Sequence, residues 1–368
     1  MSSKSILPDL DNEPTAVKTL FPDPEYFCSW SEAKRQKKER IAEQFEGVNP
    51  DIVGITHTDA DGYGCEVMLR EAFPNKEIVV VTASTGRGPL RVSNVSEFVV
   101  EHISSDIPVY ITDLSPNAGQ GEKFVHALRN QSELVVIDHH EWEQEDKNQI
   151  EWFAEVYHDT ERCATKLTHD VLIDNPRPEI TAFADLTEDH DLWIKDDRER
   201  SDALSDLANF IERDEYVSLA QKYGDSVVSS DEGVKYIEQS QKERKEKTEI
   251  AINRTTFHDV NGYKLGIAYG GCDSSDVGET LYTEYEVDLA CIMYPSGQLS
   301  FRSPDDTPIA RDIAVELGGG GHPCAAGAKP DKVGDEIQYE VHWTTKGRQM
   351  REFVVETFEN VVKTELEA

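Results

Sequence analysis

The sequence predicts an α/β protein in which a parallel-sheet domain is joined by a helical linker to a smaller mixed α/β domain. Three observations support this prediction. Short apolar segments alternate with helical segments between residues 51 and 138, a pattern typical of parallel strands with crossover helices. A helical and increasingly polar stretch covers residues 200–255, as expected of a connector between domains. Short strand-like segments then return after residue 260.

The N-terminal part of the chain is expected to contain one helix. Residues 1–28 are rich in Pro and Asp and are expected to lie over the surface. Ser31 is a suitable cap for a helix that ends near Phe45, with Ala33 and Ile41 on its apolar side. This helix is the most basic stretch of the chain. We interpret it as a solvated face, and docking of an acidic partner is the weaker alternative.

Four buried strands are predicted in the first domain. Each is a run of apolar residues that leads into polar ones, and the runs cover residues 51–56, 77–83, 108–113 and 133–138. Helices are expected between them at residues 64–73 and 118–130. Because parallel strands need crossover connections, this alternation predicts one parallel sheet with right-handed crossovers.

The second domain is predicted from three short strands and one helix. The strands cover residues 262–270, 288–295 and 297–304, and an amphipathic helix covers residues 307–317, ahead of the segment GGGGHPCAAGA. We therefore divide the chain into five parts: an N-terminal extension at 1–49, the first α/β domain at 50–205, a helical connector at 206–255, the second domain at 256–345, and a C-terminal helix or tail at 346–368.

The composition limits the function classes. The chain has 368 residues, with 72 acidic against 37 basic side chains and a formal net charge of −35. This balance excludes a general basic surface for nucleic acid, including long duplexes, but leaves room for a local phosphate pocket. Because the charge is spread along the chain, we predict a halophilic, haloarchaeal host whose salt screens the self-repulsion. An ordinary acidic cytosolic protein is the alternative.

The cysteines and the apolar pattern predict the compartment. The six cysteines are scattered without a CxxC pair, which is typical of a reducing environment. The N-terminal residues MSSKSILPDLDNEP lack the apolar run of a secretory signal, and no apolar stretch approaches the length that crosses a bilayer. We expect a soluble, cytoplasmic protein with no membrane partner. The oligomeric state stays open, with a homodimer among the options.

Acidic and histidine residues follow three predicted strands at the point where each strand ends. These clusters are His57, Asp59 and Asp61 after the first strand, Asp113 after the third, and Asp138, His139 and His140 after the fourth. The carboxyl ends of parallel strands meet at one edge of a sheet, where ligands bind. Alternate residues of an extended segment also point the same way. Carboxylates with imidazoles suit Mn²⁺, Fe²⁺, Co²⁺ or Zn²⁺, so the sequence predicts a site for one or two divalent metals.

Each cluster alone has a simpler explanation. An Asp after a strand is usually a turn residue or a helix cap, and this explanation is favoured for Asp113 taken alone. All three clusters on adjacent strands favour the metal site. A further acidic segment follows at 188–193, where Asp189 and Asp191 are both candidates. Asp113 stands between the other strands and is the natural carboxylate to bridge two metals, while His140 faces differently and is suited to contact a substrate phosphate.

Taken together, the motifs resemble those of the DHH phosphoesterases. HTDADG, TDLS, DHH and a downstream Asp are similar to the four motifs of that family. The GGGGH segment at 318–322 resembles the signature of the DHH-associated C-terminal domain, and Arg302 lies in a strand similar to its phosphate-binding strand. The resemblance covers about residues 50–330. It implies a metal-binding catalytic domain followed by a substrate-binding domain.

The resemblance implies a role for each motif residue and two divalent ions, with Mn²⁺ favoured. One ion would be bound by His57 and Asp59, the other by Asp61, His139 and Asp191, and both by Asp113. The catalytic residues would be Asp113, Asp138 and His140. The substrate would be bound by His140, Arg302, Gly319, Gly320, Gly321 and His322. Glycines allow a phosphate to approach the backbone closely, and a helix cap after Leu317 is compatible with that role.

Within the family, the chain looks most like the NrnB-type nanoRNases and RecJ-like phosphoesterases. The inorganic pyrophosphatases match less well, because their first motif is spaced differently and they lack GGGH. We therefore expect metal-dependent hydrolysis of short oligonucleotides to mononucleotides. RecJ-like single-strand exonuclease action, removal of phosphate from 3′-phosphoadenosine 5′-phosphate, and hydrolysis of a cyclic or linear dinucleotide are the alternatives. A non-catalytic regulatory subunit is disfavoured, because all six metal-binding positions are filled.

Two further segments contain candidate phosphate contacts. Arg87 and Arg91 follow the second predicted strand, although a surface loop is the favoured interpretation there. Residues 162–165 open a helix whose N-terminus can face the site, and ordinary capping is equally compatible with the sequence.

Overall fold

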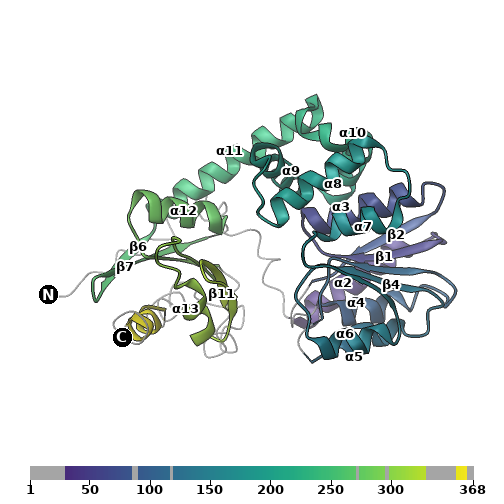
Figure 1. Cartoon of the computed structure of the whole chain (residues 1–368), viewed down its shortest axis with the longest axis horizontal. Helices are drawn as coiled ribbons and strands as arrows, with labels where there is room; N and C mark the ends of the chain where they lie inside the picture. The colour runs from purple at the N-terminus through teal and green to yellow at the C-terminus, as the bar shows by residue number, and fades with distance from the viewer. Residues whose placement is uncertain are drawn as a thin grey trace. The chain divides into compact units, whose positions relative to one another are not determined.

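The computed structural model describes residues 30–84, 90–116, 119–270, 273–294, 298–328 and 354–362. The chain divides into two compact units, one covering Trp30–Gln241 and the other containing residues from Lys242 onward (Figure 1). The fold is α/β, as predicted. The first unit has a parallel five-stranded sheet, and the second has a mixed six-stranded sheet.

All five strands of the first sheet run parallel, in the order β2-β1-β3-β4-β5. The strands are β1 (Ile52–Thr56), β2 (Ile78–Thr82), β3 (Val109–Thr112), β4 (Leu134–Asp138) and β5 (Glu155–His158). The four predicted strands are all present, and β1 and β4 are buried along their whole length because helices cover both faces. The edge strand β5 is absent from the sequence-based prediction, because it is partly exposed and offers no apolar run.

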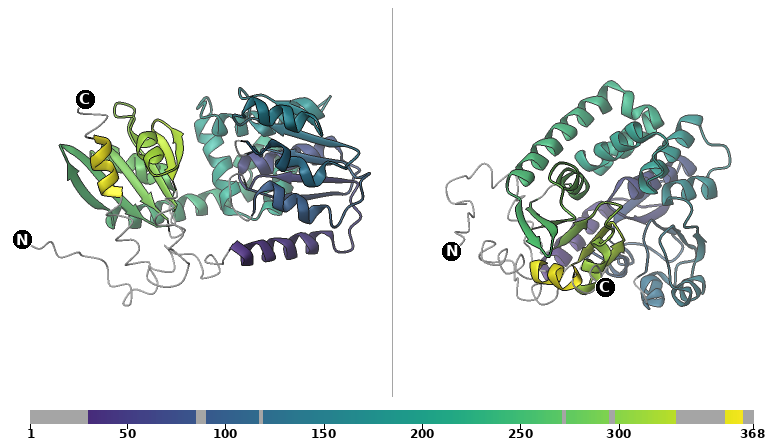
Figure 2. Two further views of the ribbon diagram at one scale, coloured as in Figure 1. Left: turned by 90° about the horizontal axis from the view of Figure 1, so that it is seen from below. Right: turned by 60° about the vertical axis from the view of Figure 1, so that its left-hand side comes forward.

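One face of this sheet is covered by helices from the first half of the unit (Figures 1 and 2). They are α2 (Trp30–Phe45), α4 (Val92–Val99), α5 (Gly121–Val125), the short η2 (His126–Leu128) and α6 (Gln144–Glu151). The predicted N-terminal helix, α2, packs here against α4 and β2, with Ile41 and Phe45 in the core. The N-terminal helix is therefore part of the first unit and covers its sheet.

The opposite face carries two helical layers. Next to the sheet lie α3 (Ala60–Ala72) and α7 (Ala164–Leu172). Val67 and Met68 of α3 pack in turn against an outer group of helices. This group comprises α8 (Pro178–Asp191), α9 (Arg198–Phe210), α10 (Arg213–Tyr223) and the 3₁₀ segment η3 (Gly224–Ser229). The long helix α11 (Asp231–Asn253) spans the boundary between the two units.

The second unit is built on a sheet of order β10-β11-β9-β8-β7-β6. The strands are β6 (Thr256–Val260), β7 (Tyr263–Tyr269), β8 (Leu289–Met293), β9 (Leu299–Arg302), β10 (Gly320–His322) and β11 (Ala325–Ala328). Helix α12 (Ser274–Glu284) contributes to one core, whereas α13 (Ala310–Glu316) and residues 354–362 contribute to the other. The predicted strands and helix correspond to β7, β8, β9 and α13.

The glycine-rich segment differs from a simple loop. Gly318 has a φ of 79° directly after Leu317, which is the helix cap that the sequence suggests. The residues that follow form β10, which pairs with β11 as a hairpin. Its alternating pattern is hidden in the sequence because glycine has no side chain. Among the described helices, none combines the length and apolar character needed to cross a membrane.

Candidate metal centre

Acidic and histidine side chains gather beyond the carboxyl ends of the parallel strands. Their ligand atoms form three overlapping groups, and within each group the atoms lie no more than 4.8 Å apart. The groups are His57, Asp59 and Asp113; Asp61, His139 and Asp191; and Asp113, His139 and His140. The structure thus brings together the six side chains that the sequence analysis assigns to metals, with His140 beside them.

Asp113 stands between the two halves of this cluster. Its Oδ1 lies 3.4 Å from His139 Nε2, and its Oδ2 lies 3.8 Å from His57 Nδ1. His139 Nε2 is also 3.6 Å from Asp61 Oδ2 and 3.5 Å from Asp191 Oδ2. A single carboxylate therefore presents one oxygen to each half, which is the arrangement that a carboxylate bridging two cations requires.

The surroundings of Asp113 suit a cation ligand. The residue is 2% exposed, and its Oδ2 is buried without a hydrogen-bond partner among the described residues. Its φ of 55° lies in the left-handed region, which costs a non-glycine residue about 1–2 kcal/mol. Its amide donates a hydrogen bond to the carbonyl of Ile137, which ties the end of β3 to β4. A buried carboxylate oxygen without a donor is costly unless a positive charge satisfies it.

The carboxylates of the cluster repel one another. Burial raises the pKa of Asp113 well above its usual range, and the charges of Asp61 and Asp59 add to the effect. Burial and the same two carboxylates raise the pKa of Asp191 to about 8. Burial lowers the pKa of His139, which favours the neutral imidazole that binds metals. This donor set fits divalent cations, because their charge would offset the repulsion between the carboxylates.

The first motif forms a tight turn from β1 into α3. Asp59 caps α3 by accepting the amide of Gly62 at 3.0 Å, and its other oxygen accepts His57 Nδ1 at 2.5 Å. Burial opposes the charge of Asp59, but the hydrogen bond and charge of His57 outweigh it, so its pKa is lowered. A Cβ atom at Gly62 would lie 2.5 Å from the carbonyl oxygen of His57, so this turn requires glycine.

Asp61 is held by the N-terminus of α7. Its carboxylate accepts the amides of Ala164 at 2.8 Å and Thr165 at 2.7 Å, and the Thr165 hydroxyl donates to its carbonyl at 2.6 Å. The helix dipole favours a carboxylate at this position. The helix start at 162–165, a candidate phosphate contact by sequence, therefore faces the site but holds one of its carboxylates.

Asp138 is completely buried and orients His140. Its Oδ1 accepts His140 Nδ1 at 2.8 Å, and its Oδ2 accepts Trp142 Nε1 at 2.6 Å. His158 Nε2 donates to the carbonyl of His140 at 2.6 Å. Burial opposes a charge on His140, but the hydrogen bond and charge of Asp138 outweigh it and raise its pKa. The ring is thus fixed through Nδ1, and its Nε2 remains for another partner.

The two candidate aspartates of the 188–193 segment have different surroundings. Both lie in the last turn of α8. Asp191 belongs to the metal cluster. Asp189 accepts the Ser201 hydroxyl at 2.6 Å and the amides of Asp196 and Asp197 at 2.7 and 3.4 Å. These hydrogen bonds use its carboxylate to stabilise the start of α9. Helical spacing places residues i and i+2 on different faces, which separates the pair.

Apart from His140, the predicted substrate residues lie in the second unit. Ala325 of β11 is paired with both Arg302 of β9 and His322 of β10, so their side chains share one face of the sheet. The Arg302 guanidinium donates to the hydroxyls of Ser274 and Ser275 at 2.8 and 3.4 Å. Burial lowers its pKa, and it forms no ion pair with a carboxylate of the described residues. Gly320 and Gly321 form the exposed strand β10 with His322, and Gly319 directly precedes it.

Two functional neighbours are missing from the sequence analysis. The indole of Trp142 and the imidazole of His158 support Asp138 and His140. Trp142 lies four residues after Asp138, which is a local signal, whereas His158 reaches the site through the fold. The helix start at 162–165 is a candidate neighbour of the site by sequence, but the sequence does not show that its amides hold Asp61. Arg87 lies outside the described residues, and Arg91 lines a polar pocket.

The comparisons with known proteins give limited matches. No family model matches the sequence. A 3′,5′-cyclic-nucleotide phosphodiesterase from Helicobacter pylori is 26% identical over 128 residues, so this chain matches about a third of it (33% of this chain, 35% of the relative). Similar solved structures include a pGpG-specific phosphodiesterase from Vibrio cholerae, with 13% identity and a TM-score of 0.48 over 83% of this chain and 98% of that one. Another is RecJ with Mn²⁺ from Thermus thermophilus, with 13% identity and a TM-score of 0.46 over 88% and 55%.

Proposed function

We propose that this protein is a hydrolase that cleaves phosphodiester bonds with the help of divalent metal ions. The observation that carries the proposal is Asp113, a buried residue whose two carboxylate oxygens face the two halves of a cluster of acidic and histidine side chains. His57 and Asp59 would hold one ion, and Asp61, His139 and Asp191 the other. When bound, such ions neutralise a phosphate and lower the pKa of water. We favour two ions and Mn²⁺, because mixed carboxylate and imidazole ligands suit it.

The chain's own residues supply orientation and hydrogen bonds. His140 is fixed through Nδ1 by Asp138, so its Nε2 can donate to a phosphate oxygen of the substrate. The raised pKa of His140, which Asp138 causes against the effect of burial, favours the protonated ring that such a contact needs. Asp113 and Asp138 are the carboxylates we place in the catalytic machinery, the first as a ligand and the second as a positioning residue. These functions lie within residues 50–205.

We propose that the second unit binds the substrate through Arg302 and through the exposed strand β10. Arg302 would contact a substrate phosphate, as His140 would in the first unit. Arg302 has five N–H donors and no carboxylate partner among the described residues, so it is suited to a phosphate. Gly320, Gly321 and His322 form an exposed edge strand that lets a phosphate approach the backbone, and His322 adds an imidazole. Gly319 precedes this strand, and its amide donates to the carbonyl of Ala314, so we assign it a role in shaping the approach. We place this function within residues 256–345, with the helical connector at 206–255.

The substrate we favour is a short oligonucleotide, cleaved to mononucleotides as in the NrnB-type nanoRNases. Longer strands gain affinity from many Lys and Arg contacts, and a chain with a formal net charge of −35 offers few of them. A cyclic nucleotide is the second candidate, because a relative that matches a third of this chain is a 3′,5′-cyclic-nucleotide phosphodiesterase. Both substrates contain a phosphodiester that the same centre can bind.

One experiment tests this proposal. The protein is purified in high salt, loaded with Mn²⁺, and offered two-, five- and twenty-nucleotide strands of RNA and DNA, a 3′,5′-cyclic nucleotide, and 3′-phosphoadenosine 5′-phosphate. We expect kcat/KM to fall as the strand lengthens. Equal or better digestion of the twenty-nucleotide strand would instead support a RecJ-like exonuclease. Hydrolysis of the cyclic nucleotide alone would favour the second candidate, and hydrolysis of none of these would reject the proposal.

The host and the compartment are also proposals. We infer a halophilic host from the 72 acidic side chains, which are spread along the chain. We infer the cytoplasm from the cysteines, because Cys65, Cys163, Cys291 and Cys324 are all free thiols in the structure.

A further inference from the structure

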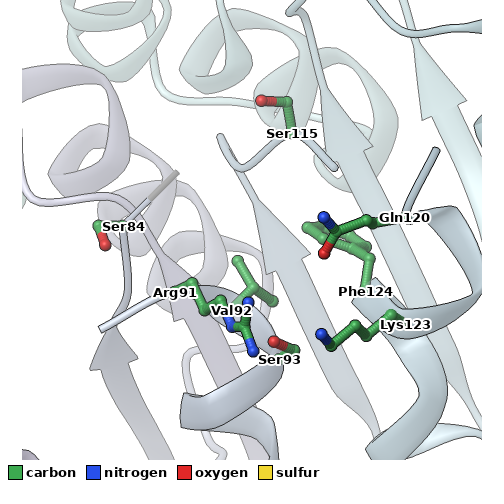
Figure 3. Close-up of a pocket in the computed structure, with 8 residues that line it drawn as sticks. All are labelled: Ser84, Arg91, Val92, Ser93, Ser115, Gln120, Lys123 and Phe124. Carbon is green, nitrogen blue, oxygen red and sulfur yellow. The ribbon is translucent and has the colours of Figure 1, made fainter. Parts of the chain in front are cut away.

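A second polar pocket lies in the first unit, beside the metal cluster. It is a small pocket, partly open to solvent, between the ends of β2 and β3 and the helices α4 and α5. Its polar lining consists of Ser84, Arg91, Ser93, Ser115, Gln120 and Lys123. Figure 3 shows the side chains of Arg91, Ser93 and Lys123 directed toward one another across the pocket. None of these six residues belongs to the ligand groups of the metal centre.

The pocket concentrates positive charge without a matching carboxylate. Neither Arg91 nor Lys123 forms an ion pair or a side-chain hydrogen bond with any part of the chain that the structure describes. The Nε atom of Arg91 is buried and has no hydrogen-bond partner among the described residues. This is unusual in a chain where acidic residues outnumber basic ones 72 to 37. Two cations that face each other repel, and a buried donor without an acceptor is costly, so an anion would stabilise both.

The donors around the pocket match a phosphate group in particular. A guanidinium and an ammonium supply charge and several N–H donors, and the hydroxyl of Ser93, which lies beside both in Figure 3, can donate a further hydrogen bond to a phosphate oxygen. A carboxylate has only two oxygens and would leave several of these donors unpaired. A tetrahedral phosphate presents enough oxygens to satisfy them.

The chain links this pocket to the metal centre. Asp113, which contributes to the cluster, is followed two residues later by Ser115, which lines the pocket. Two residues of extended chain span at most about 7 Å, so the two sites are neighbours at the end of β3. A nucleotide strand carries one phosphate per nucleotide, so a substrate with one phosphate at the metal centre has a second phosphate close by.

We propose that Arg91 and Lys123 bind a second phosphate of the substrate, next to the phosphodiester that is cleaved. This inference rests on the proposed function, because it assigns the pocket to the same substrate. It also predicts a preference for short strands that carry a terminal phosphate. The phosphate is held here by side chains of the first unit alone, so the preference does not depend on Arg302 or His322.

The kinetic test uses a dinucleotide with a 5′-phosphate, one with a 3′-phosphate, and one with neither. Lys123→Met keeps the methylene chain and removes the charge. We expect it to lower kcat/KM about tenfold on one of the two phosphorylated dinucleotides, to change the unphosphorylated one less than twofold, and to be largely rescued in Lys123→Arg. The matched control is Lys76→Met. Lys76 is an exposed lysine at the amino end of β2, whereas the pocket lies at the carboxyl end of the same strand. An equal loss of kcat/KM on all three substrates, or the same loss in Lys123→Met and Lys76→Met, would overturn the proposal.

The binding test does not need hydrolysis. In EDTA, a lysine-acylating reagent is applied and the rates at Lys123 and Lys76 are compared by mass spectrometry. We expect a phosphorylated dinucleotide to slow acylation of Lys123 at least twofold without affecting Lys76, and at lower concentrations than inorganic phosphate. Better protection by inorganic phosphate would assign the pocket to a free anion and overturn the link to substrate. Protection of Lys123 in a protein that hydrolyses no phosphodiester would sustain the pocket while the proposed function failed.

Discussion

The two groups of candidate residues are built in opposite ways. In the first unit, Asp61 and Asp113 are each 2% exposed and are fixed by backbone amides, tight turns and a strained φ. In the second unit, His322 lies on an exposed strand of glycines, and the Arg302 guanidinium donates to hydroxyls and a carbonyl. The first group carries concentrated negative charge. The second carries positive charge, and Arg302 forms no ion pair with a carboxylate of the described residues.

This difference separates stability from recognition. Buried carboxylates that repel one another are costly unless a cation is bound, so metal should stabilise the first unit as well as activate it. The exposed residues of the second unit contribute little to folding, and their loss should appear in substrate binding. The shift in melting temperature that metal causes therefore reports on the first unit. KM reports on the second unit.

The largest effect is expected from Asp113→Asn. This variant keeps the shape of the side chain but removes the charge that both halves of the cluster share, so kcat should fall at least a thousandfold. Mn²⁺ should then raise the melting temperature much less than in the wild type. The metal-free variant should be at least as stable as the metal-free wild type, because the amide is neutral like the protonated carboxyl that burial and the neighbouring carboxylates favour at this position. Activity within tenfold of the wild type would reject the two-metal assignment.

The next effect distinguishes Asp191 from Asp189. Asp191→Asn should lower metal affinity about 10–100-fold, whereas Asp189→Asn should cost about 1 kcal/mol of stability at the start of α9 and leave metal affinity unchanged. A titration of Mn²⁺ against melting temperature measures both. If the two variants lose metal affinity equally, the separation of their roles is wrong.

The Asp191 carboxyl also predicts a pH dependence in the metal-free protein. Burial and the neighbouring carboxylates raise its pKa to about 8, so the folded state keeps a proton that the unfolded chain releases near its ordinary value of 3.8. Because the folded state binds more protons, the free energy of unfolding should fall as the pH rises between these two values. Asp191→Asn should flatten this slope, as measured by urea unfolding in EDTA.

A smaller effect is expected from Asp138→Asn. The amide can no longer fix both His140 Nδ1 and Trp142 Nε1 as a charged acceptor, so His140 should lose its orientation and its raised pKa. We expect kcat to fall about 10–100-fold while the Mn²⁺-induced shift in melting temperature is retained. The double variant with His140→Gln should be little worse than either single one. If the losses of kcat in the two single variants were additive in the double variant, Asp138 would not act through His140.

In the second unit, Arg302→Met should act on binding alone. The apolar chain still fills the space beside Gly278, where a Cβ atom would lie 2.6 Å from the Arg302 side chain. KM for a dinucleotide should rise about tenfold, kcat should change little, and metal should stabilise the variant as it does the wild type. Arg311→Met, an exposed arginine on the nearby α13, is the control for loss of charge. An unchanged KM would remove Arg302 from the substrate site.

Much of the fold is predictable because the buried strands are continuous apolar runs. The runs at Ile52–Thr56 and Leu134–Asp138 contain almost no polar residue before they end in their motifs. The edge strand β5 and the glycine strand β10 are not predictable in this way. One alternates in exposure, and the other has no side chains to form a pattern.

The residues of the candidate site are likewise predictable where they follow a continuous apolar strand. Ligands that end apolar strands, such as Asp113 and His139, can be assigned to one edge because the sheet is parallel. The choice between Asp189 and Asp191 depends on how α8 ends and where α9 begins, which the letters alone do not show. The start of α7 is a candidate neighbour of the site by sequence, but its amides lie more than 100 residues from Asp61 in sequence, so their contact with that carboxylate emerges only from the fold.

The smallest expected effect separates two kinds of negative charge, the buried cluster and the acidic surface. At molar salt the Debye length is about 3 Å, so KCl screens surface carboxylates but reaches the buried ones poorly. If the surface is a halophilic adaptation, the melting temperature in EDTA should rise by several degrees between dilute buffer and 2 M KCl, and by the same amount in Asp113→Asn. Micromolar to millimolar Mn²⁺, in contrast, should stabilise the wild type and hardly the variant, because a divalent ion acts at the cluster. A flat or falling response to KCl would show that the acidic surface has another purpose, and a KCl response confined to the wild type would place the salt effect in the cluster.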